Sequence, residues 1–389
     1  MRVAVIGAGI QGVCAALELA SAGIEVHLYD AESDCLTQAS LHNEGKLHLG
    51  YVYANDPTLA TARLMIDGAL SFGPLLRRHD VAVDEIAVSE PFHYAVARTS
   101  LLDVEAVEAH LTASHRLVHL AGSRNYLGGD LAMWPHRVSL DGYDDREVVA
   151  VFRTPEIAID PGSLCEVLRR RVVEDPRIEC RFATAVDGVR RGSRGLAVSS
   201  PLGADEYDHV VNAAWAGRLA LDASLGLEPH RPWLFRWKDF LRVPRGAAAP
   251  PSTTIVLGPF GDVVAYPDGH CYLSWYPAGL RGASSAVHPR FPERVDVDSV
   301  RRSVVAGLAA LMPGVAGIDP ASGVLGGGMI FAWGKTDIDD PGSGLHERHA
   351  VGPHTFGNYH SVDTGKLTVA PLFARALADR ILEIGRVAG

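Results

Sequence analysis

The apolar positions at the start of the chain follow a strand pattern, then a helix pattern, then a strand pattern again. Residues 2–6 are a short apolar run of the kind that forms a buried parallel strand. Residues 10–22 carry apolar side chains at helical spacing, and Gly23 follows as a helix-ending residue. A second apolar run, 25–29, ends at Asp30. The pattern predicts a strand–helix–strand unit with parallel strands.

Further along, the chain departs from the regular βα repeats of a nicotinamide-type domain. Helical patterns cover 58–79, the segment that opens at Asp160-Pro161, and 370–384. An apolar strand pattern covers 208–217 and ends in small residues. Between about 230 and 300, short aromatic runs alternate with turn residues, which predicts an antiparallel sheet.

Three glycines join the first strand to the first helix as G-x-G-x-x-G. Gly7 permits the tight turn, Gly9 lets the backbone approach a pyrophosphate, and Gly12 lets helix and strand pack closely. Asp30 stands where a carboxylate accepts hydrogen bonds from ribose hydroxyls, and it disfavours NADP by repelling the 2′-phosphate. The motif does not separate NAD from FAD, and a purely structural glycine turn is the alternative. The cofactor contacts expected from this unit are Gly7, Gly9, Ile10, Gln11, Gly12, Asp30 and Ala31.

Composition and charge narrow the class of protein. The 389 residues are 47% hydrophobic and 21% charged, and the length suggests two or three domains. A net charge of −10 and the lack of a strong basic cluster argue against nucleic acid as a partner. Five scattered cysteines fit a reducing compartment. No signal peptide and no apolar run of about 20 residues is found, so we expect a cytoplasmic protein, with peripheral membrane contact left open.

The order of several short motifs resembles one known family over nearly the whole chain. The motifs are VIGAGIQG, SLHNEGKLHLGYVY, IDPGSL, VVNAAWAG and YHSVDTGKLTVAP. The chain resembles the D-amino-acid-oxidase-like (DAO) superfamily of FAD-dependent oxidoreductases, which includes glycine and sarcosine oxidases and glycerol-3-phosphate and L-2-hydroxyglutarate dehydrogenases. The resemblance implies an α/β (α+β) two-domain fold with FAD as cofactor. It places the Rossmann-like FAD domain at 1–86, 151–225 and 326–389, and the antiparallel substrate-binding domain at 87–150 and 226–325.

The resemblance also implies further cofactor contacts. The stretch 40–54 would run beside the isoalloxazine ring, where its glycines allow close backbone approach. The residues after the last strand would present backbone N–H groups and a helix N-terminus to the flavin. The residues so implied are Ser40, Asn43, Gly45, Lys46, Leu47, Val186, Ala213, Gly365, Lys366, Leu367 and Thr368.

Catalytic and substrate residues are less well defined by the sequence. The catalytic candidates are His48, Lys46 and Lys335; the substrate candidates are His48, Tyr272, Tyr276, Lys335 and Arg348. Three roles are open for His48: a general base, a covalent attachment point for flavin, or a structural histidine. Lys335 stands where amino-acid-oxidising relatives often carry an arginine for the substrate carboxylate, which weakens the case for bidentate carboxylate binding.

The expected activity is hydride transfer from a CH–OH or CH–NH group of a small polar substrate to flavin N5. Oxygen or another electron acceptor would then reoxidise the flavin. The NEGKLHLG and GKLT motifs and Lys335 favour a hydroxy acid or polyol, with an amine or amino-acid oxidase as the alternative. An NAD-binding dehydrogenase and a non-redox flavin-binding protein are further alternatives. No metal is expected, because Gly352 and Pro353 interrupt the histidine-rich stretch HERHAVGPHTFGNYH.

Overall fold

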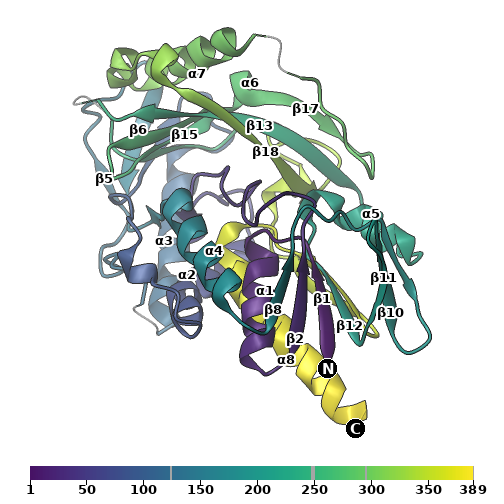
Figure 1. The fold of residues 1–389 in the computed structure, drawn as a ribbon. Helices are drawn as coiled ribbons and strands as arrows, with labels where there is room; N and C mark the ends of the chain where they lie inside the picture. Colours follow the sequence, from purple (N-terminus) through teal and green to yellow (C-terminus); the bar gives the residue numbers. More distant parts are fainter. Residues whose placement is uncertain (123–124, 247–249, 294–295, 389) are drawn as a thin grey trace.

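Two large sheets organise the protein in a computed structural model that describes residues 1–122, 125–246, 250–293 and 296–388. A six-stranded, mostly parallel sheet lies at one end of the molecule and a nine-stranded, mostly antiparallel sheet at the other (Figure 1). The predicted α/β fold class with a Rossmann-like and an antiparallel part is confirmed.

The six-stranded sheet is assembled from three separate stretches of the chain. Each neighbouring pair is parallel except the last hairpin, in which β19 and β20 are antiparallel. All of its strands fall within the segments predicted for the FAD domain. Their order is β19 (Gly352–Phe356), β20 (Tyr359–Asp363), β12 (His209–Asn212), β1 (Arg2–Ile6), β2 (Glu25–Tyr29) and β8 (Ile178–Arg181).

Side-chain alternation along β1 explains how this sheet is covered on both faces. Val3 and Val5 belong to the main core cluster, together with apolar residues of the surrounding helices. Ala4 and Ile6 point the other way, into a cluster with the small sheet of β9–β11. The covering elements are α1 (Ile10–Ser21), α2 (Ala60–Arg77), α4 (Pro161–Glu174), α8 (Ala370–Ala388), β9 (Gly188–Arg191), β10 (Leu196–Ser200) and β11 (Gly203–Tyr207).

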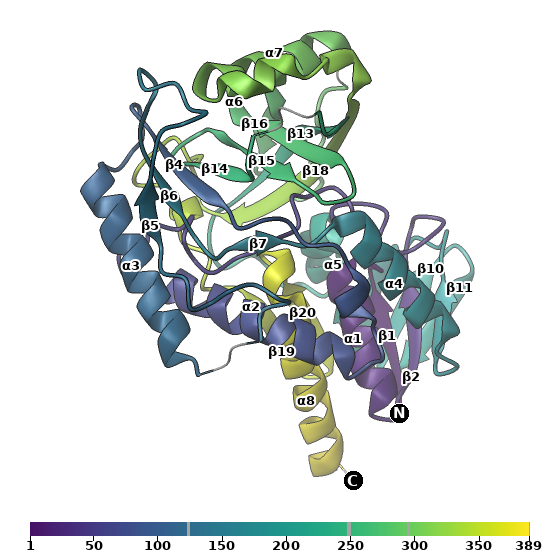
Figure 2. The same ribbon diagram turned by 90° about the vertical axis from the view of Figure 1, so that its left-hand side faces the viewer.

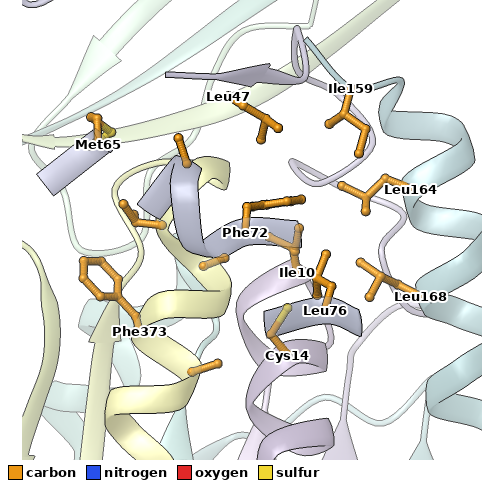
Figure 3. Packing of buried hydrophobic residues seen from close by; sticks show 14 of the residues in the cluster. Ile10, Cys14, Leu47, Met65, Phe72, Leu76, Ile159, Leu164, Leu168 and Phe373 are labelled. Carbon is orange, nitrogen blue, oxygen red and sulfur yellow. The ribbon is translucent and has the colours of Figure 1, made fainter. Parts of the chain in front are cut away.

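The packing between these helices is close. Figure 3 shows Cys14 of α1, Phe72 of α2, Leu164 of α4 and Phe373 of α8 meeting in one apolar cluster. Leu47, from the stretch 40–54, lies in the same cluster and is fully buried. The segment that carries the site candidates is therefore anchored in the core.

The nine-stranded sheet has an outer face covered by a helix and an inner face directed at the rest of the molecule. Along β16, Cys271 and Leu273 pack with the apolar face of α7 (Val297–Leu311), which lies over the outer face (Figure 2). Tyr272 between them belongs to the main core cluster on the inner face. The strands are β4 (His93–Ala97), β5 (His136–Val138), β6 (Val148–Arg153), β13 (Trp233–Pro244), β14 (Thr253–Val256), β15 (Gly261–Ala265), β16 (His270–Trp275), β17 (Leu280–Ser284) and β18 (Val324–Trp333).

Several predicted elements differ from those observed. The predicted strand 208–217 ends at Asn212, where the chain turns into the cavity described below, and α7 had no counterpart among the predicted elements. Strands β6 and β18 span the predicted domain boundaries at 150/151 and 325/326, and the division into domains stays a prediction. The remaining elements are β3 (Lys46–Leu47), β7 (Ile157–Ala158), α3 (Val104–Leu120), α5 (Arg218–Ser224) and α6 (Tyr276–Gly279). Among the described residues, no helix is long and apolar enough to cross a membrane.

Candidate active site

A large cavity lies between the two sheets, with a volume of about 920 Å³. One end is formed by the residues that follow β1, β2, β12 and β20, at the carboxyl edge of the parallel sheet. The other end is lined by side chains from β13, β14, β15 and β16 of the nine-stranded sheet. Open α/β sheets bind ligands at the carboxyl ends of their strands, so the position alone indicates a binding site.

The three glycines of the first turn differ in what surrounds them. Gly7 has φ +97°, and a Cβ there would lie 2.7 Å from the carbonyl oxygen of Ala213. A Cβ on Gly12 would lie 1.8 Å from the carbonyl oxygen of Gly7. A Cβ on Gly9 would meet only Ser40 Oγ, at 3.3 Å. The fold therefore requires Gly7 and Gly12, whereas Gly9 keeps the cavity open at the start of α1.

Backbone N–H groups fix the polar side chains at this end. Asp30 accepts from the N–H of Ala8 (2.6 Å) and from the N–H of Glu32 (2.9 Å). Ser40 Oγ accepts from the N–H of Ile10 (2.8 Å). The side-chain amide of Gln11 lines the cavity but is buried without a hydrogen-bond partner in the described part of the chain. A buried amide without a partner is costly, so a polar ligand fits this end of the cavity.

The stretch 40–54 supplies part of the cavity lining, and its Lys46 forms an ion pair with the nine-stranded sheet. Lys46 Nζ donates to Asp262 Oδ1 (2.7 Å) on β15 and to Thr254 Oγ1 (2.6 Å) on β14. Burial would lower the pKa of this lysine, but the carboxylates of Asp262, Glu156 and Glu44 outweigh burial and raise it. Lys46 is therefore a charged residue whose position is held by the nine-stranded sheet.

His48 directly follows β3 and also lines the cavity. Its N–H donates to Thr368 Oγ1 (3.0 Å), and Thr368 in turn donates to the carbonyl oxygen of Lys46 (3.1 Å). The imidazole Nε2 lies 3.9 Å from Glu44 Oε1, and the buried Nδ1 has no hydrogen-bond partner among the described residues. Burial, together with the charges of Lys366 and Lys46, holds the pKa of His48 well below its usual range. The ring is therefore neutral near pH 7, and one of its two nitrogens carries a lone pair.

A buried guanidinium, that of Arg348, lines the same cavity. Arg348 is 7% exposed and donates from Nε to the carbonyl oxygen of Leu345 (3.1 Å) and from Nη1 to that of Phe331 (3.0 Å). Within the described residues, no carboxylate lies at ion-pair distance from it. Burial, and the nearby charge of Arg236, lower the pKa of Arg348 to about 10, so it stays charged near neutral pH. A buried cation held only by neutral groups is a favourable partner for an anionic ligand.

Arg236, by contrast, already forms an ion pair with a carboxylate, that of Asp337. Its Nη1 donates to Tyr276 Oη (2.5 Å) and to Asp337 Oδ1 (2.7 Å), and Tyr276 Oη also donates to Asp337. Tyr272 stacks on Phe240 with ring centroids 4.8 Å apart. Tyr272 and Tyr276 thus form an aromatic wall whose orientation is fixed by neighbouring side chains.

Most of the candidates from the sequence come together at this cavity, and their assignment to a ligand stays a prediction. Lys335 is exposed and does not line the cavity, because it lies in the turn beyond the end of β18. Gly12, Gly45, Leu47 and Thr368 also lie outside the lining and instead support it: a Cβ on Gly45 would lie 1.8 Å from the carbonyl oxygen of Ile159. The candidates that line it are Gly7, Gly9, Ile10, Gln11, Asp30, Ala31, Ser40, Asn43, Lys46, His48, Val186, Ala213, Tyr272, Tyr276, Arg348, Gly365, Lys366 and Leu367.

Several charged residues at or beside the cavity were not found from the sequence. Glu44 stands inside the polar stretch 40–54 and could have been singled out there. Arg236 and Asp262 lie on strands whose sequence pattern predicted a sheet and nothing more, and Glu156 lies in no recognised motif. In the described part of the chain, no group of three or more His, Cys, Asp or Glu residues could hold a metal ion.

Comparison with known proteins agrees with this architecture. The family described as "FAD dependent oxidoreductase" (DAO) matches residues 2–380. Glycine oxidase from Geobacillus kaustophilus is similar in structure, with a TM-score of 0.73, 14% identity, and coverage of 98% of this chain and 95% of the oxidase. Iminodiacetate oxidase from Chelativorans sp. BNC1 has a TM-score of 0.70, 17% identity and coverage of 98% and 95%. L-proline dehydrogenase from P. horikoshii has a TM-score of 0.68, 14% identity and coverage of 98% and 92%. No curated protein sequence matches this chain.

Proposed function

Because the chain belongs to the DAO family of FAD-dependent oxidoreductases, we propose that it oxidises the CH–OH group of a small 2-hydroxy acid. The observation that carries the proposal is Arg348, a buried cation without a carboxylate partner among the described residues, in the same cavity as the neutral base His48. FAD, when bound, supplies the hydride acceptor. The protein residues then have to hold the cofactor, orient the substrate and take up its hydroxyl proton.

The dinucleotide end of the cavity fits FAD. Gly9 leaves space for a pyrophosphate at the N-terminus of α1, and Asp30 presents a carboxylate that two backbone N–H groups keep in place. The amide of Gln11, which has no partner among the described residues, offers both a donor and an acceptor. Gly365, Lys366 and Leu367 line the cavity next to the start of α8, where their N–H groups would favour an anionic flavin.

Arg348 is the residue we assign to the substrate carboxylate. Its guanidinium is fixed by two carbonyl oxygens, so little side-chain freedom is lost when an anion binds. Tyr276 and Tyr272 line the cavity as well and restrict the size of the substrate. Lys335 has no part in this assignment because it is exposed outside the cavity.

His48 is the residue we assign to the hydroxyl proton. A hydroxyl group holds its proton far more tightly than an ammonium group does, so a hydroxy acid needs a base as its hydride leaves. The neutral, buried imidazole of His48 meets that need without first having to lose a proton.

Oxidation of an amine or amino acid is the second candidate. Glu44 lines the cavity 3.9 Å from His48, and a carboxylate there would attract an ammonium group. Glycine oxidase, iminodiacetate oxidase and L-proline dehydrogenase, all similar in fold, are named for substrates of this kind. Glu44 is, however, already close to Lys366 (3.9 Å), which reduces its attraction for a second cation.

Anaerobic reduction of the bound flavin separates the two candidates. The protein is mixed with matched pairs of 2-hydroxy and 2-amino acids that share a carbon skeleton, and loss of flavin absorbance is followed in a stopped-flow instrument. We expect the hydroxy acid of a pair to reduce the flavin faster. We also expect His48→Gln to slow that reduction about 100- to 10,000-fold with FAD content unchanged. Faster reduction by the amino acids, or an unchanged rate in His48→Gln, would overturn the proposal.

A further inference from the structure

Glu156 is a fully buried carboxyl group next to the Nδ1 side of the His48 ring. It precedes β7 and is 0% exposed. One oxygen accepts from the N–H of Leu49 (2.6 Å), the other accepts from the hydroxyl of Tyr94, and this second oxygen lies 3.9 Å from His48 Nδ1. Among the described residues, no lysine or arginine lies at ion-pair distance. A carboxyl group is rarely buried without a cation unless it has a further role.

The unpartnered ring nitrogen of His48 and the buried carboxyl group of Glu156 face each other. His48 Nδ1 is buried and has no hydrogen-bond partner in the described part of the chain. The carboxyl group of Glu156 lies within ion-pair distance of this nitrogen, at 3.9 Å. The other ring nitrogen, Nε2, lies on the side of Glu44, which lines the cavity. Catalytic hydrogen bonds are often long in the absence of substrate, and a shift of the ring of about 1 Å would close this one.

We infer that Glu156 is the positioning residue of His48 and the final acceptor of the substrate proton. The carboxylate keeps the proton of the neutral ring on Nδ1, which leaves the lone pair on Nε2 toward the cavity. As hydride leaves the substrate carbon, the hydroxyl proton moves to Nε2 and the Nδ1 proton moves to Glu156. The ring is neutral again after the step, and no other oxidant or reductant takes part.

The charges around Glu156 are consistent with this role. Burial raises the pKa of Glu156 to about 7, although the charge of Lys46 and the hydroxyl of Tyr94 act in the opposite direction. A carboxylate with such a pKa accepts a proton during turnover and releases it near neutral pH. The titratable groups that face Glu156 or interact with it from the surrounding elements are Lys46, His48, Tyr51, Tyr53, Tyr94, Tyr126 and Asp262.

The inference rests on the proposed function, and the test keeps the two apart. Reduction of the bound flavin by a 2-hydroxy acid is measured from pH 5 to pH 9 in the wild type and in Glu156→Gln, Glu156→Asp and Tyr94→Phe. Tyr51→Phe is the matched control: Tyr51 packs edge-to-face against Tyr94, but its hydroxyl bonds to His115 Nδ1 (2.7 Å) instead of Glu156. Histidine ¹⁵N spectra of the same proteins report which ring nitrogen of His48 carries the proton, with His48→Gln identifying its signals.

In the wild type, we expect the rate to rise with pH through about 7, because only the ionised Glu156 accepts a proton. Glu156→Gln is expected to lose this dependence, to slow reduction about 10- to 100-fold with little change in KM, and to move the His48 proton off Nδ1. Tyr94→Phe removes a hydrogen bond to the carboxylate, so its pH dependence is expected to move upward, whereas that of Tyr51→Phe stays in place. Glu156→Asp is expected to recover part of the rate.

Three outcomes overturn the inference. If His48→Gln slows reduction while Glu156→Gln changes neither the pH dependence nor the ¹⁵N signals of His48, Glu156 is only structural and the proposed function stands. If Glu156→Gln does not fold, Tyr94→Phe replaces it in the test. A pH dependence in Tyr94→Phe that equals that of the wild type would also show that Glu156 is only structural. If His48→Gln reduces at the wild-type rate, the proposed function is wrong and the role of Glu156 is wrong with it.

Discussion

The two ends of the cavity are built in different ways. At the dinucleotide end, backbone shape makes the site: Gly7, Gly9 and Gly12 stand within six residues of one another, and Asp30 is held by two N–H groups. At the substrate end, side chains make the site, and they come from strands and loops scattered between His48 and Arg348. A site made of backbone is encoded locally, whereas a site made of side chains depends on the whole fold.

This difference explains how much could be predicted. The strand–helix–strand unit, the glycine roles and the α/β class follow from local spacing, and the ordered motifs identified the family. Glu156 and Asp262 could not be found in this way, because each acquires its partners only when distant strands meet; Lys46 and Asp262, which form an ion pair, are 216 residues apart. The exposure of Lys335 also depends on how the turn after β18 packs.

Gly9→Val is the sharpest test of the difference between the two ends of the cavity. A Cβ at Gly9 meets only Ser40 Oγ at 3.3 Å, so the fold is expected to persist while the space for pyrophosphate is lost. We expect a folded protein without bound FAD, measured as flavin absorbance per protein chain and by circular dichroism. Gly317→Val is the control, because Gly317 is exposed and nothing lies within 4 Å of its Cβ position. Stoichiometric FAD in Gly9→Val would contradict the assignment.

Gly12→Val tests whether Gly12 is needed for packing of the fold, in contrast to Gly9 of the same motif, which we expect to be needed for cofactor binding. Its Cβ would lie 1.8 Å from the carbonyl oxygen of Gly7, which neither helix nor strand can accommodate without moving. We expect little folded protein, or a free energy of unfolding lowered by at least about 3 kcal/mol. Denaturant unfolding checks this. Near-wild-type stability would mean that Gly12 serves the cofactor and not the packing.

Asp262→Asn tests the link between the two ends. The variant removes the negative charge that faces the buried Lys46, so the free energy of unfolding is expected to fall by about 3–5 kcal/mol at pH 7. Burial tends to raise the pKa of Asp262, but Lys46 outweighs it and holds the pKa below its usual value. The stability that this lowered pKa provides is present above the unfolded pKa of about 3.9 and is lost as the pH falls through the folded value.

Urea unfolding of wild type and Asp262→Asn at pH 7 and at progressively lower pH measures this difference. The gap between the two proteins is expected to narrow on acidification. A gap that stays constant would show that the ion pair contributes nothing through its charge.

Arg348→Met should have the smallest effect of these variants, and one confined to the substrate end. Loss of a charge-assisted contact of about 1.5–3 kcal/mol corresponds to a fall in kcat/KM of roughly 10- to 150-fold, mainly through KM, with FAD content unchanged. Steady-state kinetics with a 2-hydroxy acid measure it. Lys335→Met is the matched control and is expected to behave as the wild type, because Lys335 is exposed outside the cavity. The reverse result would move the anion site to Lys335.

The most direct measurement is anaerobic titration of the purified protein with a 2-hydroxy acid and, in parallel, with the methyl ester of the same acid. We expect one bound FAD per chain, bleached by the acid and barely by the ester, because Arg348 binds the negative charge that the ester lacks. Equal bleaching by acid and ester, or a well-folded protein that binds no flavin, would contradict it.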